Sequence, residues 1–335
     1  EIRFCDWSSD VCSSDLGADI DVVAPVSWIS ELKNWRNSPV ELCMAPLRVA
    51  RPTFTAIPLR WRRHDRWVTR FNSYRFQRAV EKNLPERPDF QFAYAHFFPS
   101  GLAALGAMEQ FGVPVFVNLG ESDPWDYDQL YGPQWTSVLG RFTGLIAVST
   151  TTYDYLLSRE PRLESRLRYI PNGVDTQRFR PMDRATCRKM LGLPQDKRIA
   201  LFCGHFDHRK GSRRVLEAVR RSGISGVFIG SNGPDTPQGA GVLHVGPVAN
   251  DELSVWLNAA DVFVLPSLSE GMSNAVLEAL ACGLPLVVSD REFNKAFLTP
   301  DCAVFVDPMD TRAMSEGIDR SEEHTSELQS QNRIS

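Results

Sequence analysis

The chain has 335 residues, of which 43% are hydrophobic, and its 37 Lys and Arg against 41 Asp and Glu give a formal net charge of −4 at pH 7. This near balance excludes the strongly basic character of a general nucleic-acid-binding protein, so we expect no nucleic-acid partner. A chain of this length exceeds one ordinary hydrophobic core, which predicts two domains.

The two ends of the chain can be encoded by complementary DNA. One DNA segment can encode residues 320–330, and its reverse complement can encode residues 6–16. This relation is typical of a translated sequencing adapter. We therefore predict that residues 1–16 and 320–335 are artefactual tails around natural protein at 17–319. Without the tails the formal net charge is zero.

Strand-like apolar runs alternate with helix-like patterns between the tails. The predicted strands span residues 20–25, 40–46, 90–97, 113–119, 145–149, 198–205, 226–231, 242–248, 262–268, 286–289 and 303–306. The predicted helices span residues 61–84, 100–111, 133–142, 211–221, 251–260, 273–282 and 311–318. Nearly continuous apolar strands between helices are typical of parallel sheets that are covered on both faces.

An irregular segment divides the chain near its middle. Residues 169–175 contain a proline and an Asn-Gly pair, and Pro181 follows them. Such residues indicate a connection rather than a helix or strand. We expect an α/β fold of two Rossmann-like, doubly wound domains, at residues 17–175 and 176–319, that face each other across a cleft. Ligands of α/β folds bind beyond the carboxyl ends of the strands, so the cleft is the expected site.

The segment from Ser267 to Pro285 carries two carboxylates, Glu270 and Glu278. Glu278 is the only charged residue between positions 274 and 289. An ionised glutamate is rarely buried without a partner, so this one predicts a polar ligand. Ser273 suits the N-cap of the helix, whose free N–H groups suit a phosphate. Glu278 would then accept hydrogen bonds from a ribose, although an ordinary surface position is the alternative for either glutamate.

A pair of cations, Arg209 and Lys210, follows the strand at 198–205. We expect both side chains at the carboxyl edge of that strand. Cations there would neutralise a diphosphate leaving group without a metal ion. A solvated basic turn is the alternative. No Walker motif occurs, and Gly239 and Gly241 lack the third small residue of a dinucleotide fingerprint.

Five stretches carry a resemblance to a known family. They are residues 95–101, 148–150 with 169–175, 202–211, 245–253 with 259–266, and 267–285. In this order they resemble the family-4 glycosyltransferases of GT-B architecture, and residues 267–285 match that family's signature of two glutamates eight positions apart. The resemblance implies transfer of a sugar from a nucleotide-diphosphate donor, with retention of anomeric configuration and without a metal or other cofactor.

The same resemblance implies the roles of individual residues. Glu278 would bind the donor ribose, Glu270 would face the transferred sugar, and Lys210 with Arg209 would stabilise the departing diphosphate. The other expected substrate-binding residues are Gly204, His205, Gly246, Val248, Gly271, Met272, Ser273 and Asn274.

Three departures from the family pattern are visible. His205 stands where the family usually has Arg. Gly120 stands where a His commonly contacts the donor sugar, so that Glu121 or Asp123 would have to serve. The family's first strand and last crossover helix are missing from residues 17–319, which predicts a poorly stable and inactive fragment. His96 ends a predicted strand, where an acceptor-site role and a structural hydrogen bond are both open.

Two weaker signals complete the pattern. The stretch from Arg60 to Phe71 interleaves cations with aromatic residues, which suits docking on anionic lipid, whereas a solvated helix with an apolar stripe is the alternative. Asp126 and Asp128 form a D-x-D sequence, for which we expect no metal. Scattered cysteines without a C-x-x-C pair fit a reducing cytoplasm.

These observations predict a cytoplasmic glycosyltransferase, peripheral to the inner face of a membrane, which acts on a lipid-linked acceptor in surface polysaccharide or glycolipid synthesis. Two alternatives stay open. One is a nucleotide-sugar epimerase of the same architecture, and the other is a catalytically silent nucleotide-sugar binding protein.

Overall fold

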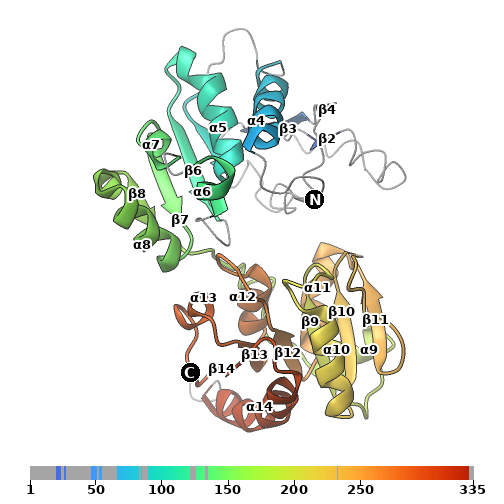
Figure 1. Ribbon diagram of the computed structural model, residues 1–335. Helices are drawn as coiled ribbons and strands as arrows, with labels where there is room; N and C mark the ends of the chain where they lie inside the picture. Colours follow the sequence, from blue (N-terminus) through green and yellow to red (C-terminus); the bar gives the residue numbers. More distant parts are fainter. Residues whose placement is uncertain are drawn as a thin grey trace. The chain divides into compact units, whose positions relative to one another are not determined.

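The computed structural model describes residues 20–23, 26–27, 47–50, 53–54, 66–82, 84, 90–120, 126–132, 135–231 and 233–331. The chain forms two compact units (Figure 1). The first ends at Ile170 and the second begins at Pro171, with Ser149–Thr151 grouped with the second. The predicted domain limit at 175 therefore lies a few residues inside the second unit.

The first unit is built on parallel strands. Its elements are β1 (Ile20–Val23), β2 (Val26–Ser27), β3 (Leu47–Ala50), β4 (Thr53–Phe54), α4 (Arg66–Glu81), β5 (Ala93–His96), α5 (Phe98–Met108), η2 (Glu109–Phe111), β6 (Val115–Leu119), α6 (Asp126–Leu130), α7 (Thr136–Leu139), β7 (Gly144–Ala147), α8 (Thr150–Arg159), η3 (Pro161–Ser165) and β8 (Leu167–Tyr169). Strands β5, β6, β7 and β8 pair in that order, and β1–β3 and β2–β4 form two more parallel pairs.

Most expected elements of this unit are confirmed, and several others were missed. The strand predicted at 40–46 lies outside the described residues. Helices α6 and α8 and strand β8 were not predicted. Helix α8 begins with three threonines, which are weak helix formers, and only two of its side chains, Thr152 and Leu156, are buried. Its apolar pattern is therefore too sparse to signal a helix.

The second unit contains a six-stranded parallel sheet. Its elements are α9 (Arg184–Met190), β9 (Ile199–Cys203), α10 (Ser212–Arg221), β10 (Ser225–Ile229), β11 (Val242–Gly246), η4 (Asn250–Glu252), α11 (Leu253–Ala259), β12 (Val262–Leu265), α12 (Asn274–Ala281), β13 (Leu286–Ser289), α13 (Glu292–Lys295), β14 (Ala303–Val306) and α14 (Thr311–Gln331). The strand order is β11-β10-β9-β12-β13-β14. All six predicted strands of this half are confirmed, and the order is that of a doubly wound Rossmann-like sheet.

The strand order creates a switch point between β9 and β12. The chain leaves β9 toward β10 on one side, and leaves β12 toward β13 on the other. Right-handed crossovers then place α10 and α12 on opposite faces of the sheet. Helix α14 lies beside α10, and α12 packs on β12 and β13 (Figure 1). The loops that follow β9 and β12 therefore meet at one edge of the sheet.

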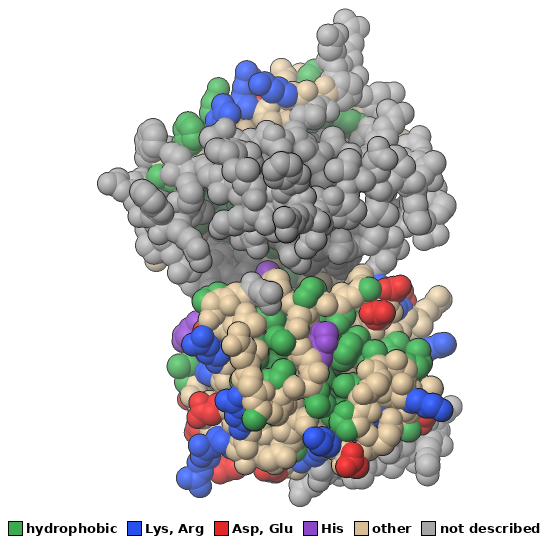
Figure 2. Space-filling model, turned by 90° about the vertical axis from the view of Figure 1, so that its right-hand side faces the viewer, with side chains coloured by type: hydrophobic (Ala, Val, Ile, Leu, Met, Phe, Trp, Pro, Cys, Tyr) green, Lys and Arg blue, Asp and Glu red, His purple; other side chains and the backbone are tan. Residues whose placement is uncertain are grey.

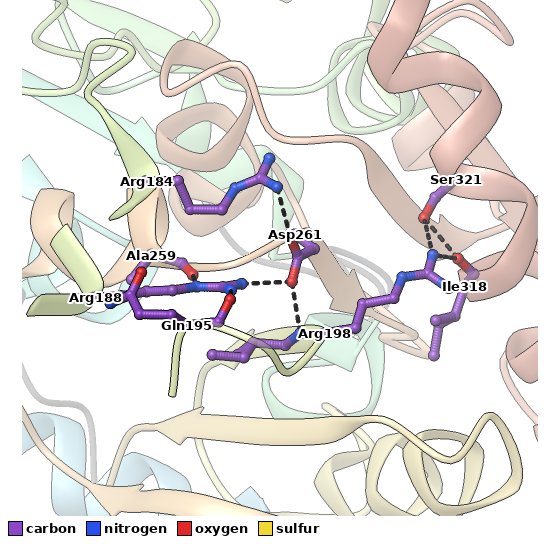
Figure 3. Close-up of polar contacts among 9 residues, drawn as sticks. Arg184, Arg188, Gln195, Arg198, Ala259, Asp261, Ile318 and Ser321 are labelled. Carbon is purple, nitrogen blue, oxygen red and sulfur yellow. Dashed lines mark hydrogen bonds and ion pairs between the residues drawn. The ribbon is translucent and has the colours of Figure 1, made fainter. Parts of the chain in front are cut away.

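An ion cluster anchors the start of β9 (Figure 3). The carboxylate of Asp261 lies 2.6 Å from the guanidinium groups of both Arg184 and Arg188. It also accepts a hydrogen bond of 2.6 Å from the amide of Ile199, and the amide of Asp261 donates back to the carbonyl of Ile199 at 2.8 Å. Arg188 is buried and donates to the carbonyl of Ala259. Every charge of the cluster thus has a partner.

Two further properties concern possible membrane and nucleic-acid partners. Within the described residues, no helix combines the length and the low polarity required for a membrane-crossing segment. On the face of the second unit shown in Figure 2, basic and acidic side chains are interspersed with hydrophobic ones and form no continuous basic patch on that face.

Candidate active site

The loops after β9 and β12 are joined at the switch point. The loop at 204–211 connects β9 to α10, and the loop at 266–273 connects β12 to α12. The amide of Leu268 donates to the carbonyl of Arg209 at 2.9 Å. The guanidinium of Arg209 donates to the carbonyl of Ser269 at 2.7 Å. These contacts fix the loops against each other, although 60 residues separate them in sequence.

Both cations meet the first glutamate of the pair. The Oε1 atom of Glu270 lies 2.5 Å from the ammonium of Lys210 and 3.3 Å from the guanidinium of Arg209. The side chains of Glu270 and Lys210 are 9% and 13% exposed, whereas Arg209 is 40% exposed. The sequence predicted that these residues share a site, and the structure adds that they form an ionic triad.

The triad determines the charge of Glu270. Burial by itself would raise the pKa of this carboxyl, but Lys210 and then Arg209 outweigh burial and hold its pKa below the usual value. Because the folded-state pKa is lowered, the stabilisation exists above the ordinary glutamate range and is lost as the pH falls through the folded-state pKa. At neutral pH the site therefore contains two cations and one carboxylate.

The first turn of α12 presents free amides. Ser273 occupies the N-cap position as predicted, but its side chain makes no capping hydrogen bond. The backbone N–H groups of residues 271–275 have no acceptor among the described residues. The Asn172 side chain donates to Asn274 Oδ1 at 2.9 Å and to the carbonyl of Met272 at 3.4 Å. The turn is held by a residue about 100 positions away and keeps donors for an anion.

Glu278 lies further along α12 and is half-buried. Burial raises the pKa of Glu278, and the nearby charge of Arg178 opposes this shift only in part. The described residues supply its carboxylate with no hydrogen bond or ion pair. The expectation that this carboxylate binds a polar ligand stays a prediction. Arg178 was missed in the sequence because it belongs to no motif and precedes Glu278 by 100 residues.

Glycines at the carboxyl edge of the sheet allow neighbouring backbone segments to approach one another closely. The amide of Gly204 donates to the carbonyl of Ile229, and the amide of Gly230 donates to the carbonyl of Gly246. A Cβ atom on Gly230 would lie 1.9 Å from the carbonyl oxygen of Gly204, so only glycine fits there. Gly246 is buried and Val248 is half-buried against the core. Both lie at the end of β11 or just after it, and β10 and β9 separate that strand from β12 in the sheet.

His205 is hydrogen-bonded to a serine, and burial disfavours its cationic form. Its Nδ1 atom lies 2.6 Å from the hydroxyl of Ser231. Burial lowers the pKa of His205, and the neighbouring Lys210 and Arg209 lower it further, although Asp207 opposes them. A neutral His205 therefore contributes a hydrogen-bonding group to the site rather than a charge.

Two predicted site residues belong to the first unit. His96 ends β5, its ring centroid lies 5.1 Å from that of Tyr94, and burial lowers its pKa. The next residue, Phe97, has a φ of 68°, a left-handed conformation that is strained for an aromatic residue. Glu121 lies outside the described residues. The acceptor-site role of His96 and the donor-sugar role of Glu121 therefore stay predictions.

The D-x-D sequence has a structural role at its second carboxylate. Asp128 accepts hydrogen bonds of 2.9 Å from Trp135 Nε1, Tyr155 Oη and Arg159. These contacts join α6 to the segment before α7 and to α8. Among the described residues, no three His, Cys, Asp or Glu side chains gather as metal ligands would.

Comparison with known sequences assigns both halves of the chain. A sequence model described as Glycosyltransferase Family 4 matches residues 15–178, and one described as Glycosyl transferases group 1 matches residues 183–334. The chain is a glycosyltransferase with a family 4 domain followed by a group 1 domain. The resemblance expected from the glutamate pair and its neighbouring motifs is confirmed, and so is the enzyme class.

Relatives and solved structures agree with this assignment. TuaC of Bacillus subtilis, named for a proposed glycosyltransferase role in teichuronic acid biosynthesis, is 29% identical over 92% of this glycosyltransferase chain and 81% of its own length. A D-inositol 3-phosphate glycosyltransferase of Frankia alni is 29% identical, over 60% of this chain and 57% of its own.

The fold likeness extends to more distant structures. Sucrose-phosphate synthase of Thermosynechococcus elongatus superposes with a TM-score of 0.71 at 21% identity, over 95% of this chain and 86% of its own. Anabaena HepE, solved in complex with UDP and glucose, superposes with a TM-score of 0.65 at 14% identity, over 84% of this chain and 79% of its own. The expected GT-B class of two Rossmann-like domains is thereby confirmed.

Proposed function

We propose that this glycosyltransferase takes its sugar from a nucleotide-diphosphate donor that binds at the switch point of the second unit. The observation that carries the proposal is the triad of Lys210, Arg209 and Glu270 beside the free amides at the start of α12. Two cations and a row of N–H donors suit a diphosphate. Glu278, whose carboxylate has no polar partner within the described part of the chain, suits the ribose hydroxyls. No metal ion or other cofactor is required to bind the donor in this arrangement.

The proposed reaction transfers a glycosyl group with retention. The acceptor hydroxyl forms a bond to the anomeric carbon on the same face from which the diphosphate departs, as the bond from that carbon to the β-phosphate oxygen breaks. The hydroxyl proton passes to the departing phosphate. Lys210 and Arg209 stabilise the negative charge that develops on the diphosphate, and the amides of Gly271 to Asn274 add hydrogen bonds. Glu270 orients the sugar and holds both cations in place.

Two of the similar proteins support the donor and acceptor classes. The solved HepE structure holds UDP and glucose, which favours a nucleotide-sugar donor. The name of TuaC favours a polymeric cell-surface acceptor. We extend both to this chain as a proposal: a nucleotide sugar donates to a lipid-linked acceptor in surface polysaccharide or glycolipid synthesis, on the cytoplasmic face of a membrane.

A donor screen tests the proposal. The chain is incubated with UDP-glucose and a panel of other nucleotide sugars, and its melting temperature is measured with each, since a ligand of the native state raises it. The stabilising donor is then mixed with membrane lipid extract, and the product's anomeric configuration is determined by NMR. We expect stabilisation by a nucleotide sugar, and a retained anomer in any product that forms; product formation would also contradict the expectation of an inactive fragment. A panel in which no nucleotide sugar alters the melt would refute the donor site.

A second candidate is a nucleotide-sugar binding protein without transfer. The burial of His205 favours it, because burial lowers the pKa of His205 and a neutral His205 leaves the diphosphate with one cation fewer than the family's usual arginine would supply. Stabilisation by a donor without nucleoside diphosphate release in any lipid extract would support this candidate. Isomerisation of the donor sugar without an acceptor would instead indicate an epimerase.

Replacing Glu278 with Gln is expected to stabilise the unliganded chain and to weaken donor binding. Because burial raises the folded-state pKa of Glu278, its ionised form costs stability at neutral pH. This cost declines as the pH falls through that pKa and vanishes below the ordinary glutamate pKa. We expect a gain on the order of 1 kcal/mol. The lost charged hydrogen bonds to ribose should weaken uridine and UDP binding by about tenfold or more.

Thermal melts between pH 4 and pH 8 and calorimetric titration with UDP measure both effects. The matched control is Glu316→Gln, since Glu316 is an exposed glutamate of the same unit. The gain in stability should shrink toward acidic pH. A lower melting temperature for Glu278→Gln at pH 7, or unchanged affinity for uridine, would contradict the assignment.

Docking on anionic lipid by the stretch from Arg60 to Phe71 stays a proposal. Residues 60–65 lie outside the described residues, and α4 begins at Arg66. We expect the chain to sediment with phosphatidylglycerol vesicles at low salt, and the triple change Arg62→Glu, Arg63→Glu and Arg66→Glu to abolish this. Equal sedimentation of the triple variant would show that the stretch does not dock.

A further inference from the structure

Arg214 lies in the first turns of α10, directly behind the loop that carries the two cations. It belongs to no motif in the sequence, and it stands among three other arginines of the same helix: Arg213, Arg220 and Arg221. Those three are exposed, whereas Arg214 is partly buried. Its position therefore differs from that of a solvated helix face.

The guanidinium of Arg214 joins the two loops of the candidate active site. Its Nη1 atom donates to the carbonyl of His208 at 2.8 Å, and its Nη2 atom donates to the carbonyl of Pro266 at 3.2 Å. His208 immediately precedes Arg209 and Lys210, and Pro266 begins the loop that carries Glu270. One planar group thus bonds the backbone on both sides of the triad, which the fixed geometry of arginine allows.

Gly211 provides the space for this contact. A Cβ atom at this position would lie 2.4 Å from Nη2 and 2.8 Å from Cζ of Arg214. Gly211 also has a φ of +82°, which favours glycine. Burial lowers the pKa of Arg214, with Asp235 and Asp207 opposing, so the charge is partly removed from water. The contact between Arg214 and the turn is therefore close and specific.

We propose that Arg214 is a positioning residue, which holds the loop of Arg209 and Lys210 at a fixed distance from the loop of Glu270 and so prepares the two cations for a diphosphate. This inference rests on the proposed donor site. Arg214 itself reaches two carbonyl groups rather than the ligand. Its effect should consequently fall on the diphosphate part of the donor and spare the nucleoside part, which Glu278 would bind.

The test compares two probes, UDP and uridine, by calorimetry and by saturation-transfer NMR. The variants are Arg214→Met, which keeps the apolar stem, and Arg214→Lys, whose single ammonium group cannot hold both carbonyls in the same fork geometry. Arg221→Met is the matched control on the same helix. We expect Arg214→Met to weaken UDP binding roughly tenfold with uridine binding unchanged, Arg214→Lys to be intermediate, and Arg221→Met to equal the parent.

A double-mutant cycle with Lys210→Ala separates positioning from general stabilisation. If Arg214 acts through Lys210, Arg214→Met should weaken UDP binding much less in the Lys210→Ala background than in the parent. Parallel losses of UDP and uridine binding, unchanged UDP binding in Arg214→Met, or full additivity in the cycle would each overturn the inference.

The proposed function fails in a different way. If the unchanged chain binds none of UDP, GDP, ADP and CDP, the donor site is refuted, and the role of Arg214 with it. Hydrogen exchange of the β9 peptide at 199–203 shows whether each variant is folded. An Arg214→Met protein that is unfolded by this measure is replaced by Arg214→Lys, in which a selective loss of UDP binding is still required.

Discussion

Replacing Lys210 with Ala is expected to weaken UDP binding by roughly 10- to 100-fold, because the proposed charge-assisted contact to the diphosphate would be lost. With a donor and an acceptor, the transfer rate should fall by about 10²- to 10³-fold, the usual loss when one group that stabilises developing negative charge is removed. Lys210 is the less exposed of the two cations, so solvent compensates for it least.

The same change alters the charge balance around Glu270. Its carboxylate would keep Arg209 at 3.3 Å but would lose the ammonium group at 2.5 Å. Burial then acts with less opposition, so the pKa of Glu270 should rise. We expect Lys210→Ala to be less stable than the parent at pH 7 and closer to it at acidic pH, because protonation removes the poorly paired charge.

Calorimetry with UDP and melts at several pH values measure these effects. The matched control is Lys189→Ala, which removes an exposed lysine from α9 of the same unit. A second variant, Lys210→Ala with Glu270→Gln, should recover stability without recovering UDP binding. Lys210→Ala with parental UDP affinity would show that the cations serve the fold rather than the donor.

Replacing Asp261 with Ala is expected to destabilise the second unit by about 3–5 kcal/mol, the usual cost of leaving a buried charge without its partner. Arg188 would lose the carboxylate that now lies 2.6 Å away, and the amide of Ile199 would lose its acceptor (Figure 3). Because Ile199 begins β9, the loss of this hydrogen bond should destabilise the strand that leads to the candidate active-site loop.

Hydrogen exchange measures the loss where it occurs. The peptide covering 199–203 should exchange faster in Asp261→Ala, and urea denaturation should give a lower midpoint. The control is Glu316→Ala, whose pair with Arg312 at 3.0 Å is exposed on both sides and should contribute less than about 1 kcal/mol. An Asp261→Ala protein with unchanged exchange in β9 would mean that the cluster is not important for stability.

The two predictions differ in how far the sequence anticipated them. Lys210 and Glu270 were predicted as site residues because each stands beside a strand end and belongs to a recognisable motif. Asp261 was only part of a run that resembles the family, and Arg188 attracted no prediction. An ion cluster between α9 and the amino end of β12 depends on a contact across more than 70 residues, which no local pattern encodes.

Local patterns succeeded where burial is periodic. The strands of the second unit were predicted from continuous apolar runs, and all six exist in a single parallel sheet. The side-chain cap at Ser273 was wrong, although the position of the helix start was right. Capping preference describes an average helix, whereas Asn172 reaches the first turn of this one from another segment.

The sequence by itself determined the class of fold, the glutamate pair, the cations and the glycine-rich turns, because each is a local arrangement of residue types with a known physical preference. Only the tertiary structure decided that Glu270 binds both cations, that Glu278 has no hydrogen-bonding or ionic partner among the described residues, and that Arg214 joins the two loops. These three facts depend on the β9–β12 adjacency, which brings the ends of two strands together across some 60 residues. The distances between the side chains of these loops follow from the pairing of the strands, and local sequence patterns do not encode such distances.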